Sequence, residues 1–251
     1  MPPMLILPVR LTESKIEHLL NDDQLSQSPI VANCRMNRER NLCGSNGYDR
    51  ELRFNPIEYL RNLAEPDCGR SEPLRWLDLC CGTGTALVEA AGIASAEHLL
   101  LEIVGVDLVD MFQQHKFPRL KFVVASLAEW QPDGQFDLVT CIHGLHYIGD
   151  KLGLICRCAN WLKDGGRFVA NIDMANIVYD GRPSSRIVTR ELRKSGFEYT
   201  SRTRLLQFTA DQKPEPQLPF HYLGADDQSG PNYTGQPAVN SHYWSGDDGE
   251  T

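Results

Sequence analysis

Trp-Leu-Asp-Leu-Cys-Cys-Gly-Thr-Gly-Thr-Ala-Leu, residues 76–87, is the stretch of sequence that decides the fold. An apolar run leads into a glycine turn and then into a helix, with Asp78 four positions ahead of Gly82. Gly82 and Gly84 allow a tight turn and a close approach of the backbone to a ligand. Free N–H groups at the start of the following helix attract polar or anionic groups. We therefore expect a nucleotide-like ligand at this turn.

Four more apolar runs follow at the spacing of strands that alternate with helices, at residues 103–107, 120–124, 136–141 and 166–172. The first of these ends in Asp107, a carboxylate at the position that accepts both hydroxyls of a ribose. Strands that alternate with helices predict a parallel sheet buried on both faces, and such sheets bind ligands at the carboxyl ends of their strands.

The series resembles the class I, Rossmann-like S-adenosylmethionine-dependent methyltransferases over roughly residues 74–224. That family has an acidic residue before a Gly-x-Gly-x-Gly turn; Asp78, Gly82 and Gly84 match it, and Cys80 replaces the first glycine. The resemblance implies an α/β fold. Its doubly wound, mostly parallel seven-stranded sheet would carry helices on both faces, an antiparallel C-terminal strand and an N-terminal helical cap.

The resemblance also implies S-adenosylmethionine as cofactor, with S-adenosylhomocysteine as product. Asp78, Gly82 and Gly84 would hold the methionine end of the cofactor. Asp107 would bind its ribose, and Ser126 with Leu127 its adenine edge. Further cofactor contacts are expected in the motif loops and in the cap, at Cys80, Leu108, Ile142, His143, Arg38, Asn46 and Tyr48. The alternative for each arginine of the cap is a solvated surface that forms salt bridges.

The strongest competing interpretation is a nicotinamide-dinucleotide enzyme on a related sheet. Its fingerprint, Gly-x-Gly-x-x-Gly/Ala, needs a third small residue for close helix packing against the pyrophosphate site. Position 87 is Leu, which favours a cofactor without phosphates. A doubly wound domain that binds no ligand is the remaining structural alternative.

Two histidines follow the fourth predicted strand, near the place where the family holds the methyl group. A histidine there can act as a base near neutral pH. We expect His146 to be the base and His143 to contact the cofactor, while Tyr147 either orients the acceptor or packs. The acceptor is then an O or N nucleophile of a small molecule, and an amine or a carboxylate needs no strong base.

Two other functions stay open at this point. One is a non-methylating reaction of S-adenosylmethionine on the same fold, such as intramolecular cyclisation of its aminocarboxypropyl arm. The other is a catalytically inactive binding protein. Asp78, Gly82, Gly84 and Asp107 favour an enzyme, since an inactive scaffold does not need a carboxylate at each point that faces the ligand.

Composition limits the partners. A net charge of −8 and a pI near 5.4 supply no basic field for nucleic acid. No apolar run approaches the length of a membrane span, and the first residues lack the pattern of a signal peptide. The eight cysteines lack paired metal-binding spacing, so no metal site is expected and reduced thiols are favoured. We expect a cytoplasmic protein that acts on a small molecule.

The expected organisation is a cap segment at 1–64, a methyltransferase domain at 65–226 and a Gly-, Pro- and aromatic-rich tail at 227–251. Within the cap, residues 11–20 suit a helix, and Asn55-Pro56 suits a helix start. A helix is expected at 184–195, and segments 197–208 and 218–223 are expected to pair antiparallel at the end of the sheet. The tail either forms a wall of the site or is a loose terminus.

Overall fold

The computed structural model describes residues 18–32, 39–64, 72–211 and 216–245. All but the last three residues of the helix expected at 11–20 lie outside these ranges. Within them, no helix combines the length and apolar character that a membrane crossing requires.

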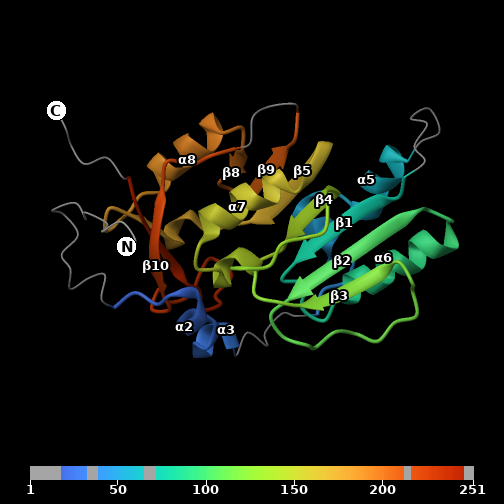
Figure 1. The fold of residues 1–251 in the computed structure, drawn as a ribbon, viewed down its shortest axis with the longest axis horizontal. Helices are drawn as coiled ribbons and strands as arrows, with labels where there is room; N and C mark the ends of the chain where they lie inside the picture. Colours follow the sequence, from blue (N-terminus) through green and yellow to red (C-terminus); the bar gives the residue numbers. More distant parts are fainter. Residues whose placement is uncertain (1–17, 33–38, 65–71, 212–215, 246–251) are drawn as a thin grey trace, which may run out of the picture.

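A seven-stranded sheet in the order β3-β2-β1-β4-β5-β9-β8 forms the centre of the protein (Figure 1). Strands β1 to β5 are parallel, β9 is antiparallel to β5, and β8 is antiparallel to β9. This topology confirms the predicted fold class. The strands are β1 (Leu74–Leu79), β2 (Leu101–Asp107), β3 (Leu120–Val124), β4 (Phe136–Cys141), β5 (Leu162–Asn171), β8 (Glu198–Thr200) and β9 (Leu205–Thr209).

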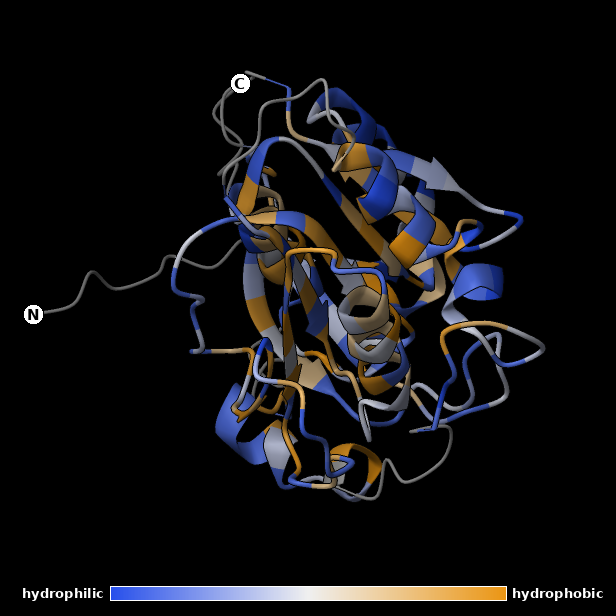
Figure 2. Cartoon of the chain, turned by 90° about the vertical axis from the view of Figure 1, so that its right-hand side faces the viewer, coloured by the Kyte–Doolittle hydropathy of each residue, from blue (hydrophilic) through white to orange (hydrophobic). Residues whose placement is uncertain are grey.

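Helices cover both faces of this sheet because its strands are apolar on both sides. Leu77 and Leu79 of β1 pack in one core with α7 (Lys151–Asn160) and α8 (Ser185–Lys194). Trp76, the residue before Leu77, belongs to the opposite core. That core includes α4 (Tyr48–Leu52), α5 (Pro56–Leu63) and α6 (Thr85–Ala96). Figure 2 shows hydrophobic segments gathered at the sheet.

Local signals placed several helices correctly. The side chain of Asn55 accepts hydrogen bonds from the N–H groups of Ile57 and Glu58, and Pro56 is the first residue of α5. The cap satisfies two N–H groups that the helix leaves unpaired, and proline lacks the third. The helix expected at 184–195 is α8, at Ser185–Lys194.

One expectation about the strands was wrong. The antiparallel pair at the end of the sheet is β8 with β9, and both lie within 197–209, almost entirely inside the first of the two expected segments. The chain reverses between them at a turn in which Arg204 has a φ of 55°. This turn contains no glycine or proline, the residues that usually indicate a turn in a sequence. Residues 221–223 instead belong to β10, in a second sheet.

The second sheet has the order β10-β11-β6-β7 and lies beside the main sheet (Figure 1). Strand β11 pairs antiparallel with β10 and parallel with β6. The C-terminal segment therefore supplies an inner strand of a sheet. The strands are β6 (Ile177–Tyr179), β7 (Arg182–Pro183), β10 (His221–Asp226) and β11 (Asn240–Trp244).

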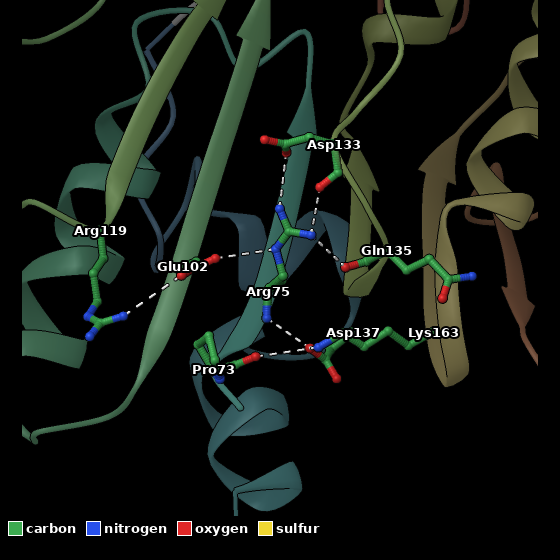
Figure 3. Close-up of polar contacts among 8 residues, drawn as sticks. All are labelled: Pro73, Arg75, Glu102, Arg119, Asp133, Gln135, Asp137 and Lys163. Carbon is green, nitrogen blue, oxygen red and sulfur yellow. Dashed lines mark hydrogen bonds and ion pairs between the residues drawn. The ribbon is translucent and has the colours of Figure 1, made fainter. Parts of the chain in front are cut away.

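Ion pairs join the amino ends of the central strands (Figure 3). The Arg75 guanidinium contacts Asp133 and lies 3.3 Å from Glu102. The Arg75 backbone N–H donates to the carboxylate of Asp137, which also accepts from Lys163 Nζ at 2.9 Å. These contacts join β1, β2, β4 and β5 at one edge of the sheet, and the edge at their carboxyl ends is available for a ligand site.

A fully buried lysine joins α7 to the second sheet. Lys151 Nζ donates to Ile148 O at 2.9 Å, to Val239 O at 2.7 Å and to Ser241 Oγ at 2.8 Å. Burial lowers the pKa of Lys151 to about 7. Its three hydrogen bonds connect the start of α7 with β11 and the residue before it.

Replacing Lys151 by Met is expected to lower the free energy of unfolding by about 2–4 kcal/mol, because three buried oxygen acceptors lose their donor. Urea unfolding measures the loss, and faster amide exchange in β10 and β11 locates it. Lys121→Met, at an exposed position of β3, is the control and should change stability by less than about 0.5 kcal/mol. Equal stabilities of the two variants would contradict the assigned role of Lys151.

Candidate active site

A cavity of about 450 Å³ lies at the carboxyl ends of β1, β2, β3 and β4. This is the place where open parallel sheets bind ligands. The strands contribute the residues that directly follow them: Cys80, Cys81 and Gly82 after β1, Asp107 and Leu108 from β2, Ala125, Ser126, Leu127 and Ala128 after β3, and Ile142, His143, Gly144, His146 and Tyr147 after β4.

The glycine turn after β1 has left-handed backbone conformations at Cys80, Gly82 and Gly84, with φ values of 55°, 61° and 72°. A Cβ on Gly84 would lie 2.2 Å from the ring of Phe122. Gly84 thus lets α6 approach β3, and it does not line the cavity. Cys80 and Gly82 do line it.

Asp107 is held at the cavity wall by two backbone groups. Its Oδ2 accepts from Gly82 N–H at 2.9 Å, and its Oδ1 accepts from Val109 N–H at 3.2 Å. The first bond ties the end of β2 to the turn after β1. The carboxylate therefore has a fixed orientation beside the turn, at the position expected for ribose binding.

Asp78 is fully buried behind the cavity and does not line it. Its carboxyl group accepts hydrogen bonds from the Tyr48 hydroxyl, at 2.7 Å, and from the Thr140 hydroxyl. Trp76 Nε1 donates to the same Thr140 oxygen. Burial raises the pKa of Asp78 to about 7. Asp78 thus contacts Tyr48, which reaches the cavity, rather than the cavity itself.

The cap segment brings an arginine that the sequence reasoning missed. Arg40 lines the cavity, and its Nη1 lies 3.0 Å from Asn46 Oδ1 and 3.4 Å from Glu51 Oε1. Asn46 does not line the cavity but holds Arg40. Arg38 lies outside the described residues. The arginine-rich composition of this segment was the available signal, and it did not distinguish Arg38 from Arg40.

His143 lies between a carboxylate and a phenol. Its Nε2 is 3.1 Å from Glu51 Oε2, and its Nδ1 is 3.2 Å from the Tyr233 hydroxyl. Burial raises the pKa of Tyr233, so its hydroxyl stays protonated and donates a hydrogen bond to Nδ1. Nε2–H then donates to Glu51, which fixes both the tautomer and the ring orientation.

His146 has a different environment. Its side chain is 1% exposed, and neither ring nitrogen has a hydrogen-bond partner among the described residues, although the residue lines the cavity. Burial lowers the pKa of His146 to about 3, and the charges of His143 and Lys151 contribute. His146 is therefore neutral at physiological pH.

The C-terminal segment forms part of the cavity wall. Thr234 and Gln236 line the cavity, and the Val239 N–H donates to the carbonyl of His146 at 2.9 Å. Tyr233 contacts both histidine rings, with a centroid distance of 6.0 Å to His143 and 5.4 Å to His146. Of the two roles considered for the tail, the described residues take that of a wall.

Two further carboxylates line the cavity. Asp22 of α2 (Asp22–Ser26) lies there with Asp150 and Tyr222. Burial raises the pKa of Asp22, and the neighbouring Asp150 adds to the shift. No motif in the sequence pointed to these three residues.

Most of the predicted site residues meet in this one cavity. They are Tyr48, Cys80, Gly82, Asp107, Leu108, Ser126, Leu127, Ile142, His143, His146 and Tyr147. Asp78, Gly84 and Asn46 lie behind them. In the described part of the chain, no three His, Cys, Asp or Glu side chains gather in a way that would hold a metal ion.

The raised pKa of Asp78 predicts a pH dependence of stability. Its ordinary value is 3.8, so between about pH 4 and pH 7 the folded protein holds a proton that the unfolded chain has lost. Its contribution to stability therefore falls as the pH rises through this window. Asp78→Asn does not titrate, so the stability of the wild type relative to this variant should fall by roughly 2–4 kcal/mol. If the free energies of unfolding of the wild type and of Asp78→Asn change with pH by the same amount, the assignment is wrong.

Comparison with known proteins gives matches of one kind. The family model described as "Methyltransferase domain" matches residues 48–182. The ubiquinone biosynthesis O-methyltransferase of Bordetella pertussis is 30% identical over 135 residues, which cover 47% of this chain and 52% of that protein. That of Xanthomonas campestris is 36% identical over 98 residues, or 37% and 40% of the two chains. The chain thus matches about half, or less, of the length of these curated relatives.

Two solved structures are also similar. The DszA carbon methyltransferase has a TM-score of 0.46 at 17% identity, over 62% of this chain and 53% of that one. The N-methyltransferase NodS of Bradyrhizobium japonicum, solved with S-adenosylhomocysteine, has a TM-score of 0.38 at 13% identity, over 67% and 94%. Because the family model spans more than half of the sequence, from Tyr48 of the cap to β7, the protein belongs to the methyltransferase domain family.

Proposed function

We propose that this protein transfers a methyl group from S-adenosylmethionine to a hydroxyl oxygen of a small molecule. The observation that carries the proposal is the Glu51–His143–Tyr233 arrangement, whose histidine lines the same cavity as the glycine turn and Asp107. A carboxylate-oriented histidine is a proton acceptor suited to a hydroxyl. The curated relatives are named O-methyltransferases, which supports the same choice.

The residues present fit the proposed cofactor. The fixed carboxylate of Asp107 suits the two ribose hydroxyls, and Ser126 with Leu127 suits the adenine edge. Arg40, a fixed cation at the cavity wall, suits the carboxylate of the methionine end. The cavity volume of about 450 Å³ lies within the range of small-ligand sites.

When bound, S-adenosylmethionine supplies an electrophilic methyl group on its sulfonium. The protein then has to exclude water, align the acceptor oxygen with the S–CH₃ bond and take up the hydroxyl proton. We assign the proton to Nδ1 of His143. Nδ1 accepts from the Tyr233 hydroxyl in this structure, so the acceptor hydroxyl would have to displace that hydroxyl in order to donate its proton there. Glu51 stabilises the charge that His143 gains.

His146 takes the second role in this proposal. A neutral imidazole with two unpaired ring nitrogens can donate one hydrogen bond and accept another without carrying a proton away. We therefore assign His146 to binding and orienting the acceptor. This reverses the assignment made from the sequence, where His146 was the expected base and His143 the cofactor contact.

We also propose a cytoplasmic location, a small-molecule acceptor and no nucleic-acid substrate. The cysteines that the structure describes are all free thiols, which suits a reducing compartment. The volume and the mostly apolar lining of the cavity suit a small acceptor.

The cofactor assignment predicts the effect of ligands on unfolding. S-adenosylmethionine or S-adenosylhomocysteine at 100 times its dissociation constant should add about 2.7 kcal/mol to the free energy of unfolding, and NAD should add nothing. Arg40→Gln should weaken S-adenosylhomocysteine binding about tenfold. Arg61→Gln, which breaks an exposed ion pair with Glu97, is the matched control. A stabilisation by NAD alone would overturn the assignment.

Replacing each of the two histidines should change the kinetics in a different way. Turnover is measured as the release of S-adenosylhomocysteine with a panel of phenols, alcohols and amines as acceptors. With a hydroxyl acceptor, His143→Ala should lower kcat by about 10²-fold or more while cofactor binding stays intact. Glu51→Gln should lower kcat less, because the histidine remains. His146→Ala should mainly raise the acceptor KM. Full turnover by His143→Ala together with a large kcat loss in His146→Ala would restore the assignment made from the sequence.

A further inference from the structure

A second hollow, which the proposed reaction does not use, lies between α8 and the turn that joins β8 to β9. This groove has a volume of about 610 Å³. None of the residues that line it is Asp or Glu, and five of them are cationic: Arg186, Arg190, Arg193, Lys194 and Arg204. We call it the basic groove.

The charge of the basic groove contrasts with that of the whole protein. The chain has a net charge of −8, yet residues 182–204 contain seven of its 25 Lys and Arg residues and only two Glu. A hollow lined by one sign of charge focuses its field and attracts ions of the opposite sign. The concentration of positive charge in this one segment of an acidic protein therefore indicates a site that attracts anions.

Helical spacing places these cations together. Arg186, Arg190 and Arg193 stand at positions i, i+4 and i+7 of α8, on one face of the helix. Val188 and Leu192 occupy the opposite face and are fully buried in the core. The arginine face is thus fixed in direction by the packing of the helix.

Neighbouring carboxylates neutralise only part of this charge. Glu191 pairs with Arg190 and Lys194, and Asp173 lies 3.4 Å from Arg204. Arg186 and Arg193 form no ion pair with any carboxylate in the described part of the chain. The guanidinium groups of Arg186 and Arg193, on the same face of α8, are thus available to bind an external anion.

We propose that the basic groove binds a small molecule that carries phosphate groups. Guanidinium groups bind phosphate oxygens through paired, charge-assisted hydrogen bonds. The hydroxyls of Ser185, Thr189 and Ser201 line the same groove and supply further donors. Its volume is that of a small-ligand site, which favours a free phosphate compound over a macromolecule.

One residue of the basic groove, Arg204, contacts Tyr233, which in turn contacts a histidine of the active site. The Arg204 guanidinium lies 5.6 Å from the centre of the Tyr233 ring, and the Tyr233 hydroxyl contacts His143 on the other side. The two sites are thus neighbours that differ in charge: cations and no carboxylate line the groove, whereas both carboxylates and arginines line the cavity.

Isothermal titration with inorganic pyrophosphate at about 50 mM salt tests the proposal. We expect saturable binding at one site of the wild-type protein, and binding at least about tenfold weaker in the Arg186→Gln/Arg193→Gln variant. Lys116→Gln/Lys121→Gln removes the same charge from exposed positions before and within β3 and should bind like the wild type. Absence of saturable binding, or an equal loss in both double variants, would overturn the proposal.

Two further measurements distinguish a small phosphate compound from a membrane surface, and the basic groove from the proposed active site. Sedimentation with phosphatidylserine vesicles should show no binding that depends on Arg186 and Arg193. If the protein binds these vesicles through the two arginines but does not bind pyrophosphate, the proposal of a small phosphate compound is wrong and the ligand is a membrane surface. Both double variants should keep the stabilisation by S-adenosylhomocysteine. Because pyrophosphate binding is measured without cofactor or acceptor, its failure and a failure of the methyltransferase assignment are distinguishable.

Discussion

The hydrogen bond from Tyr48 to the buried carboxyl group of Asp78 is the contact on which the site depends. It fixes the first residue of α4 against β1, and Thr140 adds β4 to the same network. Glu51 lies one turn further along α4 and reaches His143 and Arg40. One buried carboxyl group therefore sets the position of the groups proposed to orient the base and to bind the cofactor, without touching either ligand.

The sequence predicted the part of the site that depends on local patterns. The glycine turn, Asp107 and the loop after β4 follow strands whose order and spacing define their meeting point, so their residues converge as expected. Arg40, Glu51 and Tyr233 come from segments without periodicity and reach the site only through long-range packing. The neutrality of His146 depends on burial, and no residue near it in the sequence indicates that burial. The β8–β9 reversal was missed because its left-handed residue is Arg204.

The two ends of the parallel strands in the main sheet have different roles: contacts at the amino ends stabilise the sheet, and the carboxyl ends form the cavity. At the amino ends, the backbone N–H of Arg75 and the ammonium group of Lys163 both donate to the buried carboxylate of Asp137 (Figure 3). At the carboxyl ends, His146 keeps both ring nitrogens unpaired beside a cavity. An unpaired buried polar group costs free energy in the folded protein. In the proposed function, an acceptor that pairs with His146 would recover this cost as binding affinity.

The parallel pairing of β11 with β6 has a consequence for the order of folding. Ser241 pairs with Ile177, across a long stretch of chain that includes α8, β8, β9 and β10. Closing so long a loop has an entropy cost that contacts between nearer segments avoid, and such pairings form slowly. The glycine turn, Asp107, Ser126 and Leu127 follow β1, β2 and β3, whereas the part of the wall with Thr234 and Gln236 precedes β11 and depends on the second sheet. A folding intermediate with the main sheet formed would therefore bind cofactor before it could discriminate between acceptors.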